Sequence, residues 1–158
     1  MTHQDDLRML LDLEEIRQLK YAYFRCLDTK DWDGVAACFV PEATASYPSQ
    51  ECAGRDEILA FLTASLAPDL VTMHHGHHPE IRVHDDEATG TWYLHDQVYA
   101  VAHDFALEGA ALYEDRYVRT SDGWRMTPPG PERIFESTRT TTGLTMKQGA
   151  RSRGERPA

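Results

Sequence analysis

Residues 14–39, EEIRQLKYAYFRCLDTKDWDGVAACF, join two predicted helices through a polar turn. The first helix spans residues 5–28, because apolar residues recur along it near the 3.6-residue period of an amphipathic helix. The second helix is short, begins after an N-cap at Asp31 and ends before Pro41. The apolar positions of the first helix are Leu7, Leu10, Leu11, Ile16, Leu19, Tyr23 and Cys26 or Leu27.

The remaining pattern predicts an α+β fold. A short strand over 43–47 and a third helix over 56–66 complete the first half of the chain, and strand character dominates after Pro68. This order predicts helices on one face of a strongly curved, mostly antiparallel sheet, which together form a cone-shaped α+β barrel. The open end of such a cone is a pocket for a small apolar molecule. The expected later strands are 70–78, 80–84, 87–103, 105–120, 123–128 and 131–138.

Composition narrows the class of protein. The chain has 158 residues, 41% of them hydrophobic, and 16 basic against 26 acidic residues give a net charge of -10. This charge argues against nucleic acid as a partner. No apolar run approaches the ~20 residues of a membrane span. We see no secretory signal at the N-terminus and therefore expect a cytoplasmic protein.

The last twelve residues differ from the rest. Residues 147–158, KQGARSRGERPA, carry a net charge of +3 and no large apolar side chain. We therefore expect a disordered basic tail behind a single domain of residues 1–146.

Histidines are the most conspicuous candidates for chemistry. Five of the eight lie in or near one predicted strand, and alternation places His74 and His78 on one face and His75 and His77 on the other. Imidazole titrates near neutral pH and suits acid–base catalysis. The pattern alone leaves open which face meets the pocket.

Metal binding is the alternative use of these histidines. His75 and His77 could chelate a metal with Glu80, but only two residues separate His77 from Glu80, fewer than in the cupin motif. The chain has no zinc-type set of Cys and His, no GxGxxG and no phosphate loop. We therefore expect neither a metal nor another cofactor.

Four further residues could serve the pocket. Asp28 ends the first helix, where the macrodipole disfavours an anion, so it either pairs with a cation such as histidine or lies in a solvated turn. Tyr23 lies about 140° away on an ideal helix and could equally fill the core. Asp96 sits among apolar residues and needs a partner or a wet pocket. Arg133 could point into the cone or lie on an exposed edge.

The order of these motifs resembles the SnoaL-like family of the nuclear transport factor 2-like (NTF2-like) superfamily. The resemblance covers roughly residues 7–140. Within the family it points to the branch of small cofactor-free lyases that includes bile-acid 7α-dehydratase, scytalone dehydratase and hexachlorocyclohexane dehydrochlorinase. The motifs that carry it are the segment 14–39, GRDEILAFL (54–62), TMHHGHHPEI (72–81), ATGTWYLHD (88–96) and YEDRYVRTSDGWRM (113–126).

The resemblance implies roles for individual residues. His74 would be a general base paired with Asp28 from the end of the first helix. Tyr23 would donate a hydrogen bond to the substrate, Asp96 would assist the leaving group or orient the substrate, and Arg133 would bind developing negative charge.

The resulting expectation is a dehydratase-like lyase that needs no cofactor. Its substrate would be a small apolar molecule of steroid, polyketide or aromatic type, and it would form a homotrimer or homodimer. An isomerase or cyclase with the same dyad, a non-catalytic carrier of a small molecule and a subunit of a larger oxygenase are the alternatives.

Overall fold

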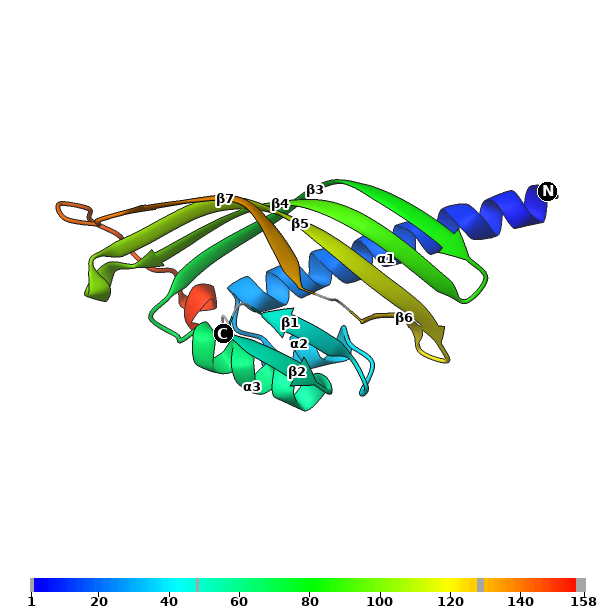
Figure 1. Cartoon of the computed structure of the whole chain (residues 1–158), viewed down its shortest axis with the longest axis horizontal. Coiled ribbons are helices and arrows are strands. Elements are labelled where there is room, and N and C mark those ends of the chain that lie inside the picture. The colour runs from blue at the N-terminus through cyan, green and yellow to red at the C-terminus, as the bar shows by residue number, and fades with distance from the viewer. Residues whose placement is uncertain (1, 48, 128–129, 156–158) are drawn as a thin grey trace.

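The helices of the computed structural model follow the sequence pattern. The structure describes residues 2–47, 49–127 and 130–155. The long helix α1 (His3–Asp28) runs beside the sheet, while α2 (Trp32–Ala37) and α3 (Arg55–Ser65) lie beneath its concave side (Figure 1). Helix α1 begins earlier than predicted, because Thr2 and Asp5 form a reciprocal capping box. Asp31 caps α2 as expected, with its carboxylate accepting from the Gly34 N–H.

The sheet has the predicted antiparallel order. Its strands pair in the order β3-β4-β5-β6, and β7 pairs with β5 beside β6. The cone-shaped α+β fold is thereby confirmed, with a sheet that curves without closing (Figure 1). The strand bounds are β3 (Val71–His84), β4 (Glu87–Ala100), β5 (Phe105–Thr120), β6 (Gly123–Met126) and β7 (Pro131–Arg139).

Three details differ from the expected elements. The two strands 70–78 and 80–84 are one strand, β3, interrupted by a register shift between His77 and Glu80, where Pro79 has no N–H to donate. The end of the segment 87–103 turns into a 3-10 helix, Val101–His103. Strand β1 (Thr44–Tyr47) pairs with a strand that the sequence pattern missed, β2 (Gln50–Ala53).

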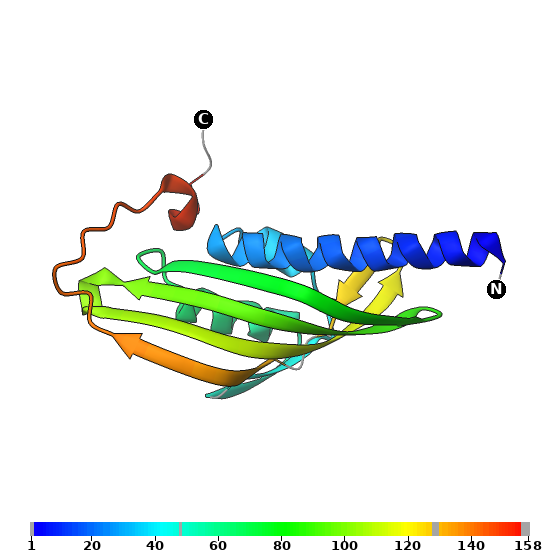
Figure 2. The same cartoon turned by 90° about the horizontal axis from the view of Figure 1, so that it is seen from above.

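The apolar stripe of α1 is buried over only part of its length. Ile16, Tyr23 and Leu27 lie in the core, whereas Leu7, Leu10 and Leu11 are exposed. Figure 2 shows that the N-terminal end of α1 reaches beyond the neighbouring strands. The predicted periodicity therefore identifies the helix correctly, but the core covers only its second half.

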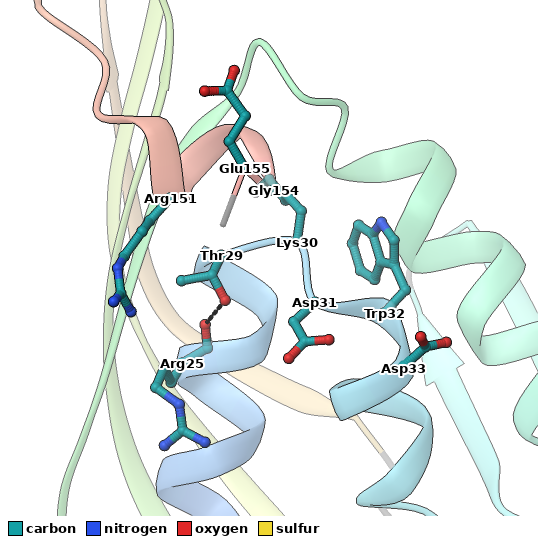
Figure 3. A pocket seen from close by; sticks show the side chains of 9 residues that line it. All are labelled: Arg25, Thr29, Lys30, Asp31, Trp32, Asp33, Arg151, Gly154 and Glu155. Atoms are coloured by element: carbon teal, nitrogen blue, oxygen red, sulfur yellow. Dashed lines mark hydrogen bonds between the residues drawn. The ribbon is translucent and has the colours of Figure 1, made fainter. Parts of the chain in front are cut away.

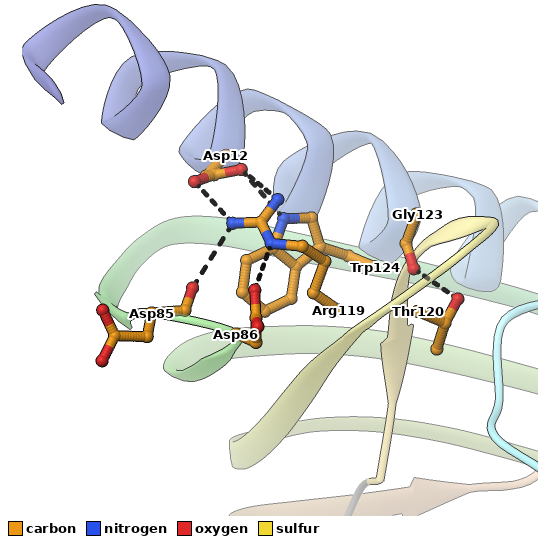
Figure 4. A network of polar contacts seen from close by, with 7 residues as sticks. All are labelled: Asp12, Asp85, Asp86, Arg119, Thr120, Gly123 and Trp124. Atoms are coloured by element: carbon orange, nitrogen blue, oxygen red, sulfur yellow. Dashed lines mark hydrogen bonds and ion pairs between the residues drawn. The ribbon is translucent and has the colours of Figure 1, made fainter. Parts of the chain in front are cut away.

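An arginine fork fixes the middle of α1 on the sheet (Figure 4). Arg119, on β5, donates through Nη1 and Nη2 to the two carboxylate oxygens of Asp12, each at 2.7 Å, and through Nε to Asp86 Oδ1 at 2.9 Å. Trp124 Nε1 also donates to Asp12, and its ring lies 4.3 Å from the guanidinium carbon. Asp12 is only 5% exposed. The fork therefore joins α1, the β3–β4 turn and the β5–β6 hairpin.

The described part of the basic tail packs against the rest of the chain. A 3-10 helix, Ala150–Arg153, lies near the end of α1, and Gln148 Nε2 donates to the Pro68 carbonyl. The boundary at residue 146 stays a prediction. Within the described ranges, no helix is both long and apolar enough to cross a membrane.

We expect Arg119→Met to lower the free energy of unfolding by about 2–3 kcal/mol, because Asp12 would stay buried without its charged partner. The matched control is Arg116→Met, since Arg116 is exposed on the same strand. Urea denaturation of both variants measures the difference. Equal losses in the two variants would mean that the fork does not stabilise the fold.

Candidate functional site

The turn after α1 brings Asp28 to the sheet. Helix α1 ends at Asp28, Thr29 caps it, and Lys30 adopts a left-handed conformation with φ 56°. This single left-handed residue reverses the chain so that Asp31 can begin α2 at once. Asp28 is thus held at the C-terminal end of α1, next to the edge strand β3.

Asp28 and His74 form a hydrogen-bonded pair. His74 Nδ1 lies 2.7 Å from Asp28 Oδ1, and the backbone N–H of His74 donates to Asp28 Oδ2 at 3.0 Å. Thr72 Oγ1 donates to Asp28 Oδ1 at 2.9 Å. The carboxylate at the unfavourable end of a helix is therefore stabilised by three contacts from β3.

This geometry sets the tautomer of His74. Because Asp28 accepts from Nδ1, a neutral imidazole carries its proton there and keeps Nε2 as a basic lone pair. The ring stacks on Phe24, with centroids 6.1 Å apart and planes 4° from parallel. The side chain of His74 is 11% exposed and that of Asp28 is 23% exposed, so the pair is shielded yet reachable. This arrangement can abstract a proton.

A groove beside the pair is wide enough for a small molecule. It encloses about 670 Å³ between α1 and β3, and includes both members of the pair. Gly76 shapes its floor, since a Cβ there would lie 2.5 Å from the Phe24 ring. The lining residues are Tyr21, Phe24, Arg25, Asp28, Thr29, His74, His75, Gly76 and His77.

A second cavity lies on the far side of the α1 terminus (Figure 3). It encloses about 620 Å³ between the turn after α1, the start of α2 and the C-terminal 3-10 helix. Lys30, Trp32 and Arg151 contribute to its lining, and Arg25 lines both this cavity and the groove. Its walls carry both basic and acidic side chains, so their charge indicates neither an anionic nor a cationic ligand.

Asp96 and Arg133 meet each other. Arg133 Nη1 donates to Asp96 Oδ1 at 2.5 Å and Nη2 to Oδ2 at 2.9 Å, a bidentate pair in which the Arg133 side chain stays 37% exposed. Asp96 is 2% exposed, and its hydrogen bonds raise the pKa of Arg133. Asp96 stands directly opposite His74 in the register of β3 and β4. The two sites therefore share the concave face.

Gly109 makes the Asp96–Arg133 pair possible. It lies on β5, between the strands that carry the two partners, and pairs with Asp96 in register. A Cβ at this position would lie 2.8 Å from Arg133 Nη1 and 3.2 Å from Asp96 Oδ1. The absence of a side chain on the middle strand leaves room for the guanidinium to cross it.

Tyr23 lies deeper than the groove. Its ring packs on Phe24 and Phe39 in the core, and its hydroxyl lies in an environment shared with Tyr47 and Tyr113. Burial raises the pKa of Tyr23 well above its usual value, so the hydroxyl stays protonated and can only donate or accept as a neutral group. Tyr23 does not line the groove beside His74.

The sequence pattern missed a buried ion pair on the concave face. Lys20 Nζ lies 2.7 Å from Asp115 Oδ2, and both side chains are fully buried. Tyr117 donates to the same oxygen at 2.8 Å, and Lys20 Nζ also lies 3.6 Å from the centroid of the Tyr113 ring. The available signal was a lysine on the buried face of α1 facing an inward position of β5.

Three other histidines, His75, His77 and His95, lie together on the opposite face of the sheet. The rings of His75, His77 and His95 are 6.2–6.5 Å apart, and His95 Nε2 lies 3.0 Å from Glu108 Oε1. No group of three His, Cys, Asp or Glu side chains in the described chain is arranged to hold a metal ion. The expectation of a metal-free protein stays a prediction.

The open cone of helices on a curved antiparallel sheet is a fold that this chain shares with solved structures. Residues 8–128 match the SnoaL-like domain, and the chain belongs to that family. Three solved structures share the fold of this chain. Their sequence identities to it, 18–20%, are too low to show more than a common fold.

Two of these three structures carry the name of an enzyme, and the third carries none. Hexachlorocyclohexane dehydrochlorinase LinA type 2 is 18% identical with a TM-score of 0.78, covering 90% of this chain and 97% of its own. A candidate scytalone dehydratase from Novosphingobium aromaticivorans DSM 12444 is 20% identical with a TM-score of 0.73, covering 81% and 87%. Kfla4162 from Kribbella flavida is 20% identical with a TM-score of 0.75, covering 82% and 95%.

We expect Gly109→Ala to displace Arg133 from Asp96 and to lower the free energy of unfolding by about 1–3 kcal/mol, the usual cost of overpacking. Gly149→Ala is the matched control, because no atom lies within 4 Å of its added Cβ. Chemical denaturation compares the two variants. Unchanged stability of Gly109→Ala would show that the strands absorb the methyl group without strain.

Proposed function

We propose that this protein is a cofactor-independent lyase of the dehydratase type, with His74 as its base. The observation that carries the proposal is the 2.7 Å contact between His74 Nδ1 and Asp28 Oδ1, which leaves Nε2 basic beside a groove. Membership of a family whose fold is shared by a dehydrochlorinase supports an elimination reaction. The substrate we propose is a small apolar molecule of steroid, polyketide or aromatic type.

The proposed reaction removes a proton and a leaving group from adjacent carbons. His74 Nε2 takes a proton from a carbon next to a carbonyl, and the C–H electron pair becomes the new carbon–carbon double bond. The leaving group departs with its own bonding pair as hydroxide, which takes the proton from the His74 imidazolium and leaves as water, so that the neutral base is restored. Asp28 holds the tautomer of His74 and stabilises the imidazolium that forms.

The remaining polar residues have proposed supporting roles. Arg133 binds negative charge that develops on the substrate oxygen, while Asp96 orients Arg133 and assists the leaving group. Tyr23 lies behind the groove with a hydroxyl that burial keeps protonated, and its hydrogen bond to the substrate stays a prediction. The bidentate contact of Asp96 with Arg133 supports their action as one unit.

A homo-oligomer is the proposed assembly, as a trimer or a dimer. Apolar side chains that remain exposed on the convex face of the sheet, such as Met73, Tyr93 and Phe135, support this proposal. Size-exclusion chromatography with light scattering measures the assembly directly.

The dyad is tested by single and double substitutions. Across a panel of β-hydroxy ketones and steroid-like alcohols, Asp28→Asn should lower kcat by about 10²–10⁴-fold, because the charge that holds the tautomer is lost. His74→Ala should nearly abolish turnover, and the double variant should be little worse, since the two residues act as a unit.

His78→Ala is the matched control, because His78 is exposed on the same strand and does not line the groove. It should retain most of the activity. An essential His75 with a dispensable His74 would overturn the assignment of the base. A product of unchanged mass would indicate an isomerase, and ligand binding without turnover would indicate a carrier.

The absence of a cofactor is tested by metal removal. We expect dialysis against a strong chelator to leave kcat unchanged, because the proposed chemistry uses only side chains of the chain. Elemental analysis of the untreated protein should find no stoichiometric metal. One zinc or iron per chain, with activity lost on chelation, would revive the alternative in which His75 and His77 are ligands.

A further inference from the structure

We infer that Lys30 is a positioning residue for the dyad, which acts through the hydroxyl of Thr72 on the carboxylate of Asp28. The inference rests on the proposed function, because it assigns Lys30 the task of keeping His74 available as a base. The sequence pattern gave Lys30 no role beyond that of a turn residue.

Hydrogen bonds give the chain from Lys30 to His74 a fixed direction. Lys30 Nζ donates to Thr72 Oγ1 at 3.2 Å, and the ammonium has no lone pair with which to accept. The single hydroxyl proton of Thr72 is therefore free to point to Asp28 Oδ1, 2.9 Å away. The same oxygen receives the contact from His74 Nδ1. Asp28 Oδ1 therefore contacts both His74 and the hydroxyl of Thr72 to which Lys30 donates.

The ammonium of Lys30 is buried, which makes its placement costly. Lys30 is 7% exposed and Thr72 is 5% exposed. The tail helps to cover the lysine, since a Cβ at Gly154 would lie 3.5 Å from Lys30 Cβ (Figure 3). Burial lowers the pKa of Lys30, and the charge of Asp28 opposes that change. The carboxylate and the ammonium therefore stabilise each other inside the fold.

The charge of Lys30 weakens the attraction between Asp28 and a protonated His74. An unopposed carboxylate favours the imidazolium, which cannot take another proton. A cation on the other side of Asp28 reduces that preference. The charged and titratable groups around this network are Asp28 and Arg25 on α1, Lys30 and Asp31 in the turn, Asp33 on α2, His75 and His77 on β3, Asp96 on β4, Arg133 on β7, and Arg151 and Glu155 in the tail.

Two variants remove the ammonium in different ways. Lys30→Met keeps most of the side-chain volume. Lys30→Gly suits the left-handed φ of 56° and relieves backbone strain, so it preserves folding if the methionine variant does not. Lys147→Met is the matched control, because Lys147 is exposed in the tail and the substitution removes the same charge.

The primary test is the pH titration of the His74 imidazole by NMR, with its signals assigned from their loss in His74→Ala. We expect the midpoint to rise by about one pH unit in Lys30→Met and Lys30→Gly, as removal of a nearby buried charge typically produces. Lys147→Met should leave it unchanged. An unchanged midpoint in both Lys30 variants would overturn the inference.

Kinetics provide the second readout. With an active substrate, kcat/KM of Lys30→Met should fall about tenfold more at pH 6 than at pH 8, because the raised midpoint matters only on the acid side. An equal loss at both pH values would mean that Lys30 supports only the fold. The NMR titration needs no substrate, so failure of the proposed lyase activity and failure of this inference are distinguishable.

Discussion

The placement of α1 against the sheet is the constraint on which the rest of the molecule depends. Three charged residues of this helix, Asp12, Lys20 and Asp28, recur every eight residues, about 12 Å along the axis. Each meets a partner of the sheet: Arg119, Asp115 and His74 respectively. Since the signs alternate along the helix, a slip of α1 by two turns would place like charges together. The pairs therefore fix the position of the helix as well as its face.

Two glycines on the sheet leave the space that the side chains of the candidate site occupy. Gly76 allows the Phe24 ring to approach β3, and that ring stacks on His74. Gly109 allows Arg133 to reach across β5 to Asp96. Both glycines lie on the concave face, where a side chain would collide with a functional neighbour. The geometry of the candidate site thus depends on missing side chains as much as on the polar ones.

Sequence reasoning succeeded where the signal was local or carried by a motif. The helices, the antiparallel pairing of β4 with β5 and the meeting of Asp28 with His74 were all anticipated. The pair Lys20–Asp115 was missed, because its partners lie 95 positions apart and only the register of β5 brings them together. Strand β2 was missed because four residues between turn signals carry no usable periodicity.

The candidate chemistry depends on a balance of charge around Asp28 rather than on His74 alone. The carboxylate lies where the helix dipole opposes an anion, and it accepts from the backbone N–H of His74, from Thr72 and from the imidazole. These donors stabilise the anion without neutralising it, so its charge still acts on the imidazole of His74. Relatives under 25% identical share the frame that brings α1 to β3. What this chain can do with that fold therefore depends on the few side chains that surround Asp28.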